Sequence, residues 1–193
     1  SLTLKATGYG LVVALAGSPQ SVERQARDFT DLFREAQARA MVILSGERAT
    51  AVWDAIGNVF DHLAGPPPDR IVCKIAAPIS RVAEFLASAE GLARRHGLRG
   101  ATIAHAGSGI VRACYLLGPD APPAEMLVGS FEEVRYEAQR VDGSLVFLEA
   151  PRDLKAHADA WGKPGDDFDL MRHLKAEFDP RNLCNPGRFL GGL

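Results

Sequence analysis

The hydrophobic positions of the chain fall into two patterns, short continuous apolar runs and longer stretches with apolar residues at every third or fourth position. A continuous run is typical of a strand that is buried on both faces. Spacing of three and four residues is typical of a helix that buries one face. The runs predict strands at 9–16, 40–44, 71–76, 101–106, 110–117 and 144–149.

Several of the predicted helices have recognisable ends. Ser18 and Pro19 supply a capping hydroxyl and a residue whose φ is already helical. Gly97 follows a last turn rich in cations, as is usual at a helix C-terminus. The C-terminal tail is predicted to be irregular, because Pro180 and Pro186 interrupt it. The spacing predicts helices at about 19–36, 47–60, 78–96, 127–141 and 166–178.

Strand–helix–strand units in series, joined by a hairpin, predict an α+β fold. We expect a ferredoxin-like, largely antiparallel sheet with helices packed on one face, followed by the irregular tail. We treat 1–193 as one domain with a possible sub-boundary at 65–68, where Gly65 and three prolines prevent a helix interior or a central strand.

Composition excludes several classes of function. The chain has 24 acidic residues against 22 Lys and Arg, so it lacks the positive surplus of a nucleic-acid-binding protein. No apolar run approaches the roughly 20 residues of a membrane span. The three cysteines are far apart and odd in number, which argues against a disulfide framework and favours a cytoplasmic location. Neither a GxGxxG nor a GxxxxGK[ST] motif is present, so no common nucleotide cradle is predicted in this chain.

His105 and Arg112 flank a glycine-rich turn between two predicted strands. If Ser108 and Gly109 form a two-residue hairpin turn, His105 stands directly opposite Arg112 on one face of the sheet. This pair suits a bound carboxylate, because Arg binds a carboxylate through two hydrogen bonds. The alternative is an exposed hairpin in which His105 packs at a sheet edge.

The tail contains a second group of candidate residues. Asn185-Pro186-Gly187 favours a turn, so the tail is predicted to be stiff without being regular. Asn185 and Arg188 would then present an amide and a cation to a partner surface. The alternative is a tail that simply covers an edge of the core.

Three blocks carry a family resemblance: AHAGSGIVRA at 104–113, Trp161-Gly162, and LKAEFDPRNLCNPGRFLGGL at 174–193. With these the chain resembles the C-terminal part of FAD-linked oxidases of the vanillyl-alcohol-oxidase type, and most closely the FAD-binding E subunits of bacterial glycolate oxidases. FDPxxxxNPGR is the more specific motif.

The resemblance implies a cap domain that closes over FAD, which would be bound mainly by an N-terminal domain absent from this chain. A start at Ser1 and the missing nucleotide cradle agree with that. It further implies that Asn185, Gly187 and Arg188 lie near the flavin and that the cap face bearing His105 turns toward it. The implied activity is oxidation of a small 2-hydroxy acid such as glycolate, in a complex with other oxidase subunits, including an iron–sulfur protein. We expect the chain alone to be inactive.

The sequence departs from that of related D-2-hydroxyacid dehydrogenases at positions that bind a metal. Their H-x-G-x-G-N-x-H stretch has two histidines that help to hold a divalent metal, whereas Ile110 and Arg112 stand at the Asn and second His positions here. A guanidinium has no lone pair for a metal. We therefore expect no metal, and we expect Arg112 to bind the substrate carboxylate and His105 to act as base or hydrogen-bond partner. Two other functions stay open: a non-catalytic assembly subunit and a ligand-sensing ferredoxin-like module.

Overall fold

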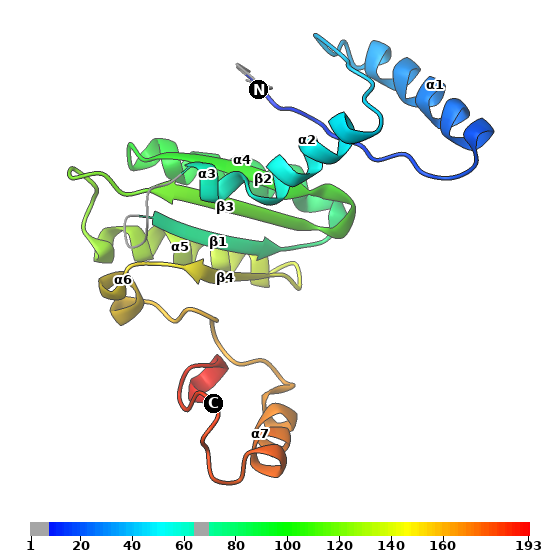
Figure 1. Ribbon diagram of the computed structural model, residues 1–193. Helices are drawn as coiled ribbons and strands as arrows, with labels where there is room; N and C mark the ends of the chain where they lie inside the picture. The colour runs from blue at the N-terminus through cyan, green and yellow to red at the C-terminus, as the bar shows by residue number, and fades with distance from the viewer. Residues whose placement is uncertain (1–7, 64–69) are drawn as a thin grey trace. The chain divides into compact units, whose positions relative to one another are not determined.

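The computed structural model describes residues 8–63 and 70–193. It divides into two units, residues 1–54 and 55–193. The sub-boundary predicted at 65–68 lies outside the described residues. The elements, labelled in Figure 1, are α1 (Pro19–Glu35), α2 (Glu47–Gly57), α3 (Val59–Leu63), β1 (Arg70–Ala76), η1 (Ile79–Arg81), α4 (Val82–Arg95), β2 (Arg99–His105), η2 (Ala106–Ser108), β3 (Ile110–Leu116), α5 (Ala124–Gln139), β4 (Ser144–Glu149), α6 (Arg152–His157), α7 (Phe168–Phe178) and η3 (Leu190–Gly192).

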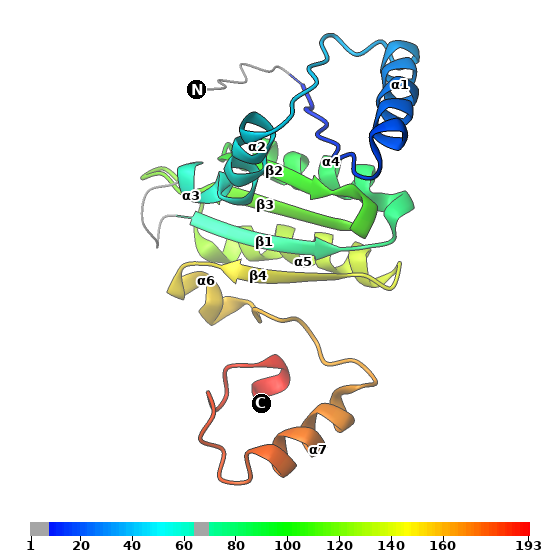
Figure 2. The ribbon, with the colours of Figure 1, turned by 45° about the vertical axis from the view of Figure 1, so that its right-hand side comes forward.

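The second unit is built on a four-stranded sheet in the order β2-β3-β1-β4. Every neighbouring pair of strands is antiparallel. The run β1-α4-β2-β3-α5-β4 with this strand order is the ferredoxin-like arrangement, and Figures 1 and 2 show α4 and α5 on the same side of the sheet. The predicted α+β fold class is therefore confirmed.

The face of the sheet that packs against α4 and α5, here called the α4/α5 face, carries the main core. Phe131 of α5 lies between two aromatic rings, with centroids 5.5 Å from Tyr115 and 5.0 Å from Phe147, both in edge-on geometry. Each of these pairs adds to the free energy gained by removing apolar surface from water. Alternating residues of the strands fill the rest of this core: Ile71, Cys73, Ile75, Val111, Ala113 and Leu145.

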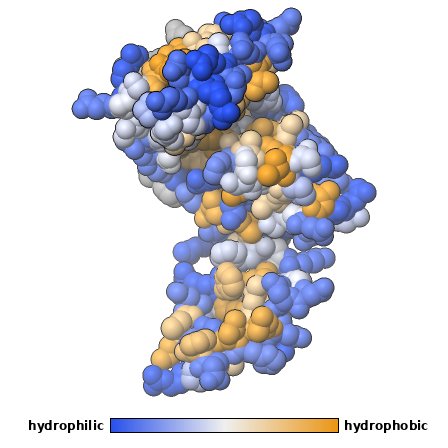
Figure 3. Space-filling model, turned by 90° about the vertical axis from the view of Figure 1, so that its right-hand side faces the viewer, coloured by the Kyte–Doolittle hydropathy of each residue, from blue (hydrophilic) through white to orange (hydrophobic). Residues whose placement is uncertain are grey.

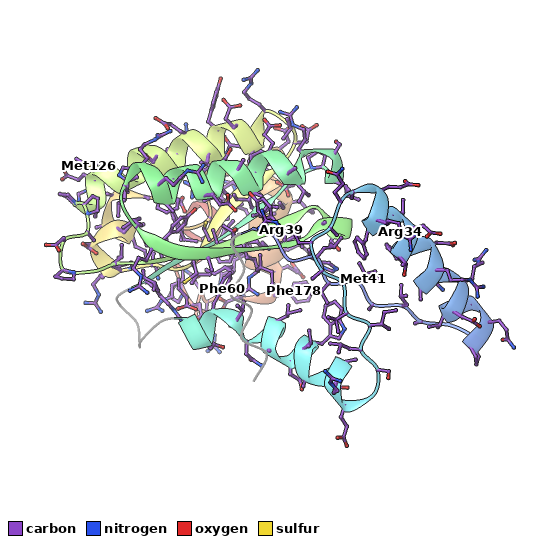
Figure 4. All side chains as sticks on the ribbon, turned by 90° about the horizontal axis from the view of Figure 1, so that it is seen from above. Arg34, Arg39, Met41, Phe60, Met126 and Phe178 are labelled. Carbon is purple, nitrogen blue, oxygen red and sulfur yellow. The ribbon has the colours of Figure 1, made fainter. Side chains whose placement is uncertain are left out.

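The opposite face of the sheet, here called the α3 face, has a much smaller apolar cluster. Phe60 of α3 packs on Val72 and Cys114, and Figure 4 shows its ring on the side of the sheet away from α4 and α5. Strand alternation places the other side chains of this face, and several of them are charged. Arg70 and Lys74 of β1 and Arg112 of β3 belong to it.

In the first unit, only the helix prediction holds. α1 begins where Ser18 accepts a hydrogen bond from the Ser21 amide, as expected of a capping hydroxyl. The strands predicted at 9–16 and 40–44 are wrong, since both segments are irregular. A strand needs a neighbour to pair with, and here the side chains stay exposed, with Val42 and Ile43 each at 70%.

The remaining helices follow the prediction with two differences. The helix expected at 47–60 is interrupted at Asn58, which separates α2 from α3. α6 was not expected, because its six residues are too few to show a helical spacing of apolar positions; it buries Leu154. α7 is present, and three of its apolar residues, Leu170, Leu174 and Phe178, are exposed, while Phe168 and Met171 are half-buried. Figure 3 shows apolar surface on the C-terminal segment.

Candidate functional site

The hairpin that carries His105 and Arg112 is longer than predicted. A 3-10 turn at 106–108 is followed by Gly109 in the left-handed region, with φ 69°. The Ala77 amide donates to the Gly109 carbonyl at 2.8 Å and so ties the turn to the end of β1. The expected two-residue turn at Ser108 and Gly109 is therefore wrong.

The longer turn changes the pairing of the two candidate residues. His105 is paired with Ile110, and Arg112 with Ile103. The predicted direct pair of His105 and Arg112 is wrong by a shift of two positions along one strand. A shift of two preserves the face, so the two side chains stay on the α3 face as diagonal neighbours, about 7 Å apart by general strand geometry.

Arg112 is exposed and is positioned by an aromatic ring. Its guanidinium carbon lies 5.2 Å from the centroid of Phe60. Such a contact holds a cation through the electron-rich ring face and leaves the N–H donors at its edge available. Within the residues described, no carboxylate forms an ion pair with Arg112. The side chain is therefore oriented and still able to bind an anion.

Arg70 on the same face is bound entirely by the chain. It donates from Nε to Glu149 at 2.6 Å, from Nη2 to Glu149 at 2.9 Å and from Nη1 to the Phe60 carbonyl at 3.1 Å. The hydrogen bond to Glu149 raises the pKa of Arg70 above its ordinary value. Arg70 thus anchors α3, and with it the ring that positions Arg112. The sequence pattern did not single out Arg70, because Glu149 is 79 positions away.

The two strand cysteines are unsuited to nucleophilic chemistry. Burial raises the pKa of Cys73 to about 12, and burial likewise raises that of Cys114. A thiol with a raised pKa carries little of the reactive thiolate at neutral pH. Both act as small apolar residues of the sheet.

In the tail, Asp179 organises the segment that precedes Asn185. Its carboxylate accepts from the Leu183 amide at 2.8 Å, the Cys184 amide at 2.9 Å and the Lys175 ammonium at 2.6 Å. The hydrogen bond from Lys175, followed by those from the two amides, lowers the pKa of Asp179 to about 2. The residues between Asp179-Pro180 and Asn185 thus form a turn that one carboxylate closes.

Asn185, Gly187 and Arg188 form the next turn. Asn185 and Gly187 have φ 47° and 71°, and the Arg188 amide donates to the Asn185 carbonyl at 3.2 Å. Trp161 fixes the end of this turn by donating from Nε1 to the Arg188 carbonyl at 3.0 Å, and its ring lies 4.7 Å from that of Phe189.

The side chains of this turn are available to bind a ligand, and we expect that ligand to be a flavin. Asn185 and Arg188 are exposed, and neither side chain has a hydrogen bond within the described part of the chain. An amide and a guanidinium are suitable donors for the carbonyl oxygens of an isoalloxazine ring. The space beside Gly187, where a side chain would begin, is open. That this turn and His105 face one flavin stays a prediction.

The residues described contain no group of three or more His, Cys, Asp or Glu side chains that is arranged to hold a metal ion. The absence of a metal remains a prediction. In the ranges 8–63 and 70–193, no helix is both long and apolar enough to cross a bilayer.

A family model described as FAD linked oxidases, C-terminal domain, matches residues 3–147 and 154–189. The chain belongs to this family. The matched ranges include His105 and Arg112 and the turn at 185–188, and the family implies FAD as the cofactor.

This FAD-linked oxidase domain is also similar to a curated protein named glycolate oxidase subunit GlcD from Bacillus subtilis (strain 168). The two are 24% identical over 180 residues, which cover 92% of this chain and 38% of that relative. The chain thus spans well under half of the relative's length. The predicted closeness to E subunits in particular stays a prediction.

Proposed function

We propose that the chain is the substrate-binding cap domain of a flavin-dependent oxidoreductase subunit that oxidises a small 2-hydroxy acid such as glycolate. Its membership of the FAD-linked oxidase family and its similarity to a protein named as a glycolate oxidase subunit support the proposal. The observation that carries it is Arg112, a guanidinium oriented by Phe60 and not neutralised by any described acid of the chain. FAD would be held mainly by a domain outside this chain.

Each candidate residue has a role in this proposal. Arg112 binds the substrate carboxylate through two parallel hydrogen bonds. His105, the diagonal neighbour on the same face, takes the proton of the substrate hydroxyl or donates a hydrogen bond to its oxygen. Asn185 and Arg188 bind the flavin, and Gly187 permits a close approach of the backbone. The bound FAD supplies the acceptor for the hydride.

The partners follow from the same proposal. The relative's name describes it as a subunit, so we expect this protein to assemble with other oxidase subunits. From the family resemblance we further expect one of them to be an iron–sulfur protein and the complex to be cytoplasmic. A purely assembly role is the second candidate. It is favoured by the exposed apolar residues of α7, where Leu170 is 62% and Phe178 83% exposed.

Replacing Arg112 by Ala in the full-length, FAD-loaded protein separates the two roles. We expect kcat/KM for glycolate to fall at least tenfold, equivalent to about 1.4 kcal/mol, because the carboxylate loses its bidentate partner. Arg99→Ala is the matched control, since Arg99 is an exposed arginine on the same face at the other end of β2. Unchanged kinetics in Arg112→Ala, with normal assembly, would favour the assembly role.

A further inference from the structure

A second cation stands directly beside Arg112. Lys74 of β1 is the register partner of Arg112 across the antiparallel β1–β3 pair. Val72, two positions earlier on the same strand, packs on Phe60, so alternation places Lys74 on the α3 face as well. Directly opposite residues of antiparallel strands have Cβ atoms about 5 Å apart.

Two like charges in this position repel one another, and no carboxylate of residues 8–63 or 70–193 pairs with them. Like charges directly opposite in a sheet are destabilising. Neither Lys74 nor Arg112 forms an ion pair with a carboxylate among the residues that the structure describes. The acid that β4 contributes near this face, Glu149, is bound by Arg70.

The register places neutral side chains in the same row as the pair. Lys74 and Arg112 are flanked in their row by Val146 of β4 and Ile103 of β2, which are neutral. The next row toward the hairpin contains Ala76 between Ile110 and Ser144, with His105 at the edge. A carboxylate between the two cations would therefore have neutral residues beside it on the side of His105, and two of them, Ala76 and Ser144, are small.

We propose that Lys74 and Arg112 together bind the substrate carboxylate, which makes Lys74 a second binding residue. This inference rests on the proposed function. Arg112 supplies a planar fork and Lys74 a compact point charge, and the two geometries are compatible with one carboxylate. Because the bound anion removes the repulsion between the cations, ligand binding and the stability of this part of the sheet are coupled.

The test uses the full-length, FAD-loaded protein and oxalate, an analogue of glycolate that offers no hydroxyl to oxidise. The dissociation constant of oxalate is measured from the change in flavin absorbance, and the melting temperature is measured without ligand. We expect Lys74→Gln to weaken oxalate binding at least tenfold and to raise the melting temperature by about 1–2 °C, because the repulsion is gone. Lys74→Arg should keep affinity within about threefold, since the charge remains.

Two further variants keep the test decisive. Lys155→Gln removes an exposed lysine of α6 by the same substitution and should change neither affinity nor melting temperature. If Lys74→Gln does not fold, Lys74→Met gives the same comparison, because it keeps the aliphatic stem and removes the charge.

The outcomes distinguish this inference from the proposed function. If Arg112→Gln weakens oxalate binding and Lys74→Gln does not, Lys74 is outside the site while the proposed function stands. If neither variant alters oxalate binding, the carboxylate site on this face is wrong and the proposed function fails with it. Release of FAD from Lys74→Gln, with unchanged oxalate affinity of the loaded fraction, would also overturn the inference by assigning Lys74 to the cofactor.

Discussion

The two faces of the sheet use their arginines in opposite ways. Arg135 of α5, beside the α4/α5 face, is 4% exposed and lies 5.4 Å from the centroid of Phe147. It donates hydrogen bonds to the Leu145 carbonyl at 3.1 Å, the Asp159 carbonyl at 2.7 Å and the Glu132 carboxylate. On the α3 face, Arg112 is exposed and has an aromatic ring as its partner. A guanidinium that the chain satisfies is a structural residue, whereas an oriented one left available can bind a ligand.

Arg70 shows that the distinction is not simply between faces. It lies on the α3 face, yet Glu149 and the Phe60 carbonyl occupy it as completely as the chain occupies Arg135. Its role is to hold α3 against the sheet. What separates these arginines is whether the chain supplies hydrogen-bond partners for the guanidinium. Replacing a satisfied arginine should reduce stability, and replacing an available one should reduce function.

The largest effect is expected from the same substitution at the two contrasting positions. Arg135→Met should lower the free energy of unfolding by about 3 kcal/mol, because two carbonyls and one carboxylate lose their buried partner. Arg112→Met should lower it by less than about 1 kcal/mol, since only a contact between a cation and a ring is lost. Urea unfolding of both variants measures the difference. Equal losses would show that Arg112 is as structural as Arg135.

A smaller effect is expected in the turn that sets the position of His105. A methyl group at Gly109 would lie 2.0 Å from the Ala77 carbonyl oxygen, and the residue has a positive φ. Gly109→Ala should therefore reduce stability by about 2 kcal/mol and also reduce kcat/KM, because the hairpin must move. At Gly107 a methyl group meets no atom within 4 Å, so Gly107→Ala is the matched control and should have little effect on either quantity. A loss of stability with unchanged kinetics would separate the hairpin from the site.

The apolar runs of the sequence predicted the strands of the second unit correctly. The runs at 71–76, 101–106, 110–117 and 144–149 are strands in the structure, because each has a partner in one sheet. The runs at 9–16 and 40–44 have the same apolar character and are irregular. A continuous apolar run shows that a segment can form a strand, but hydrogen bonding to a neighbouring strand decides whether it does.

The sequence singles out candidate residues for the site, but it does not determine which of them lie opposite one another. The glycines around 107–109 indicated a turn, but the bond from Ala77 to Gly109 comes from another strand and fixes a longer one. Lys74 was missed for the same reason, since its proximity to Arg112 depends on the order of the strands. The spacing of residues along the chain does not show which strands lie side by side or in which register.

The smallest effect is expected in the tail. There a carboxylate, like the guanidinium of Arg135, has its hydrogen-bond partners supplied by the chain. Asp179 is satisfied by Lys175 and by the amides of Leu183 and Cys184, so it should be structural and its effect local. A carboxyl whose pKa is lowered on folding stabilises the folded form above its unfolded pKa of about 3.9 and loses that contribution as the pH falls to the folded value. With a folded pKa of about 2, the turn should loosen between about pH 4 and pH 2.

Hydrogen exchange measures this directly. Protection of the Leu183 and Cys184 amides should fall across that pH range and should already be lost at neutral pH in Asp179→Asn, while amides of the sheet are unaffected. Asp166→Asn, at an exposed aspartate before α7, is the matched control and should leave both amides protected. If Asp179→Asn kept full protection, the carboxylate would not be what closes this turn, and Asp179 would not be a structural residue in the sense of Arg135.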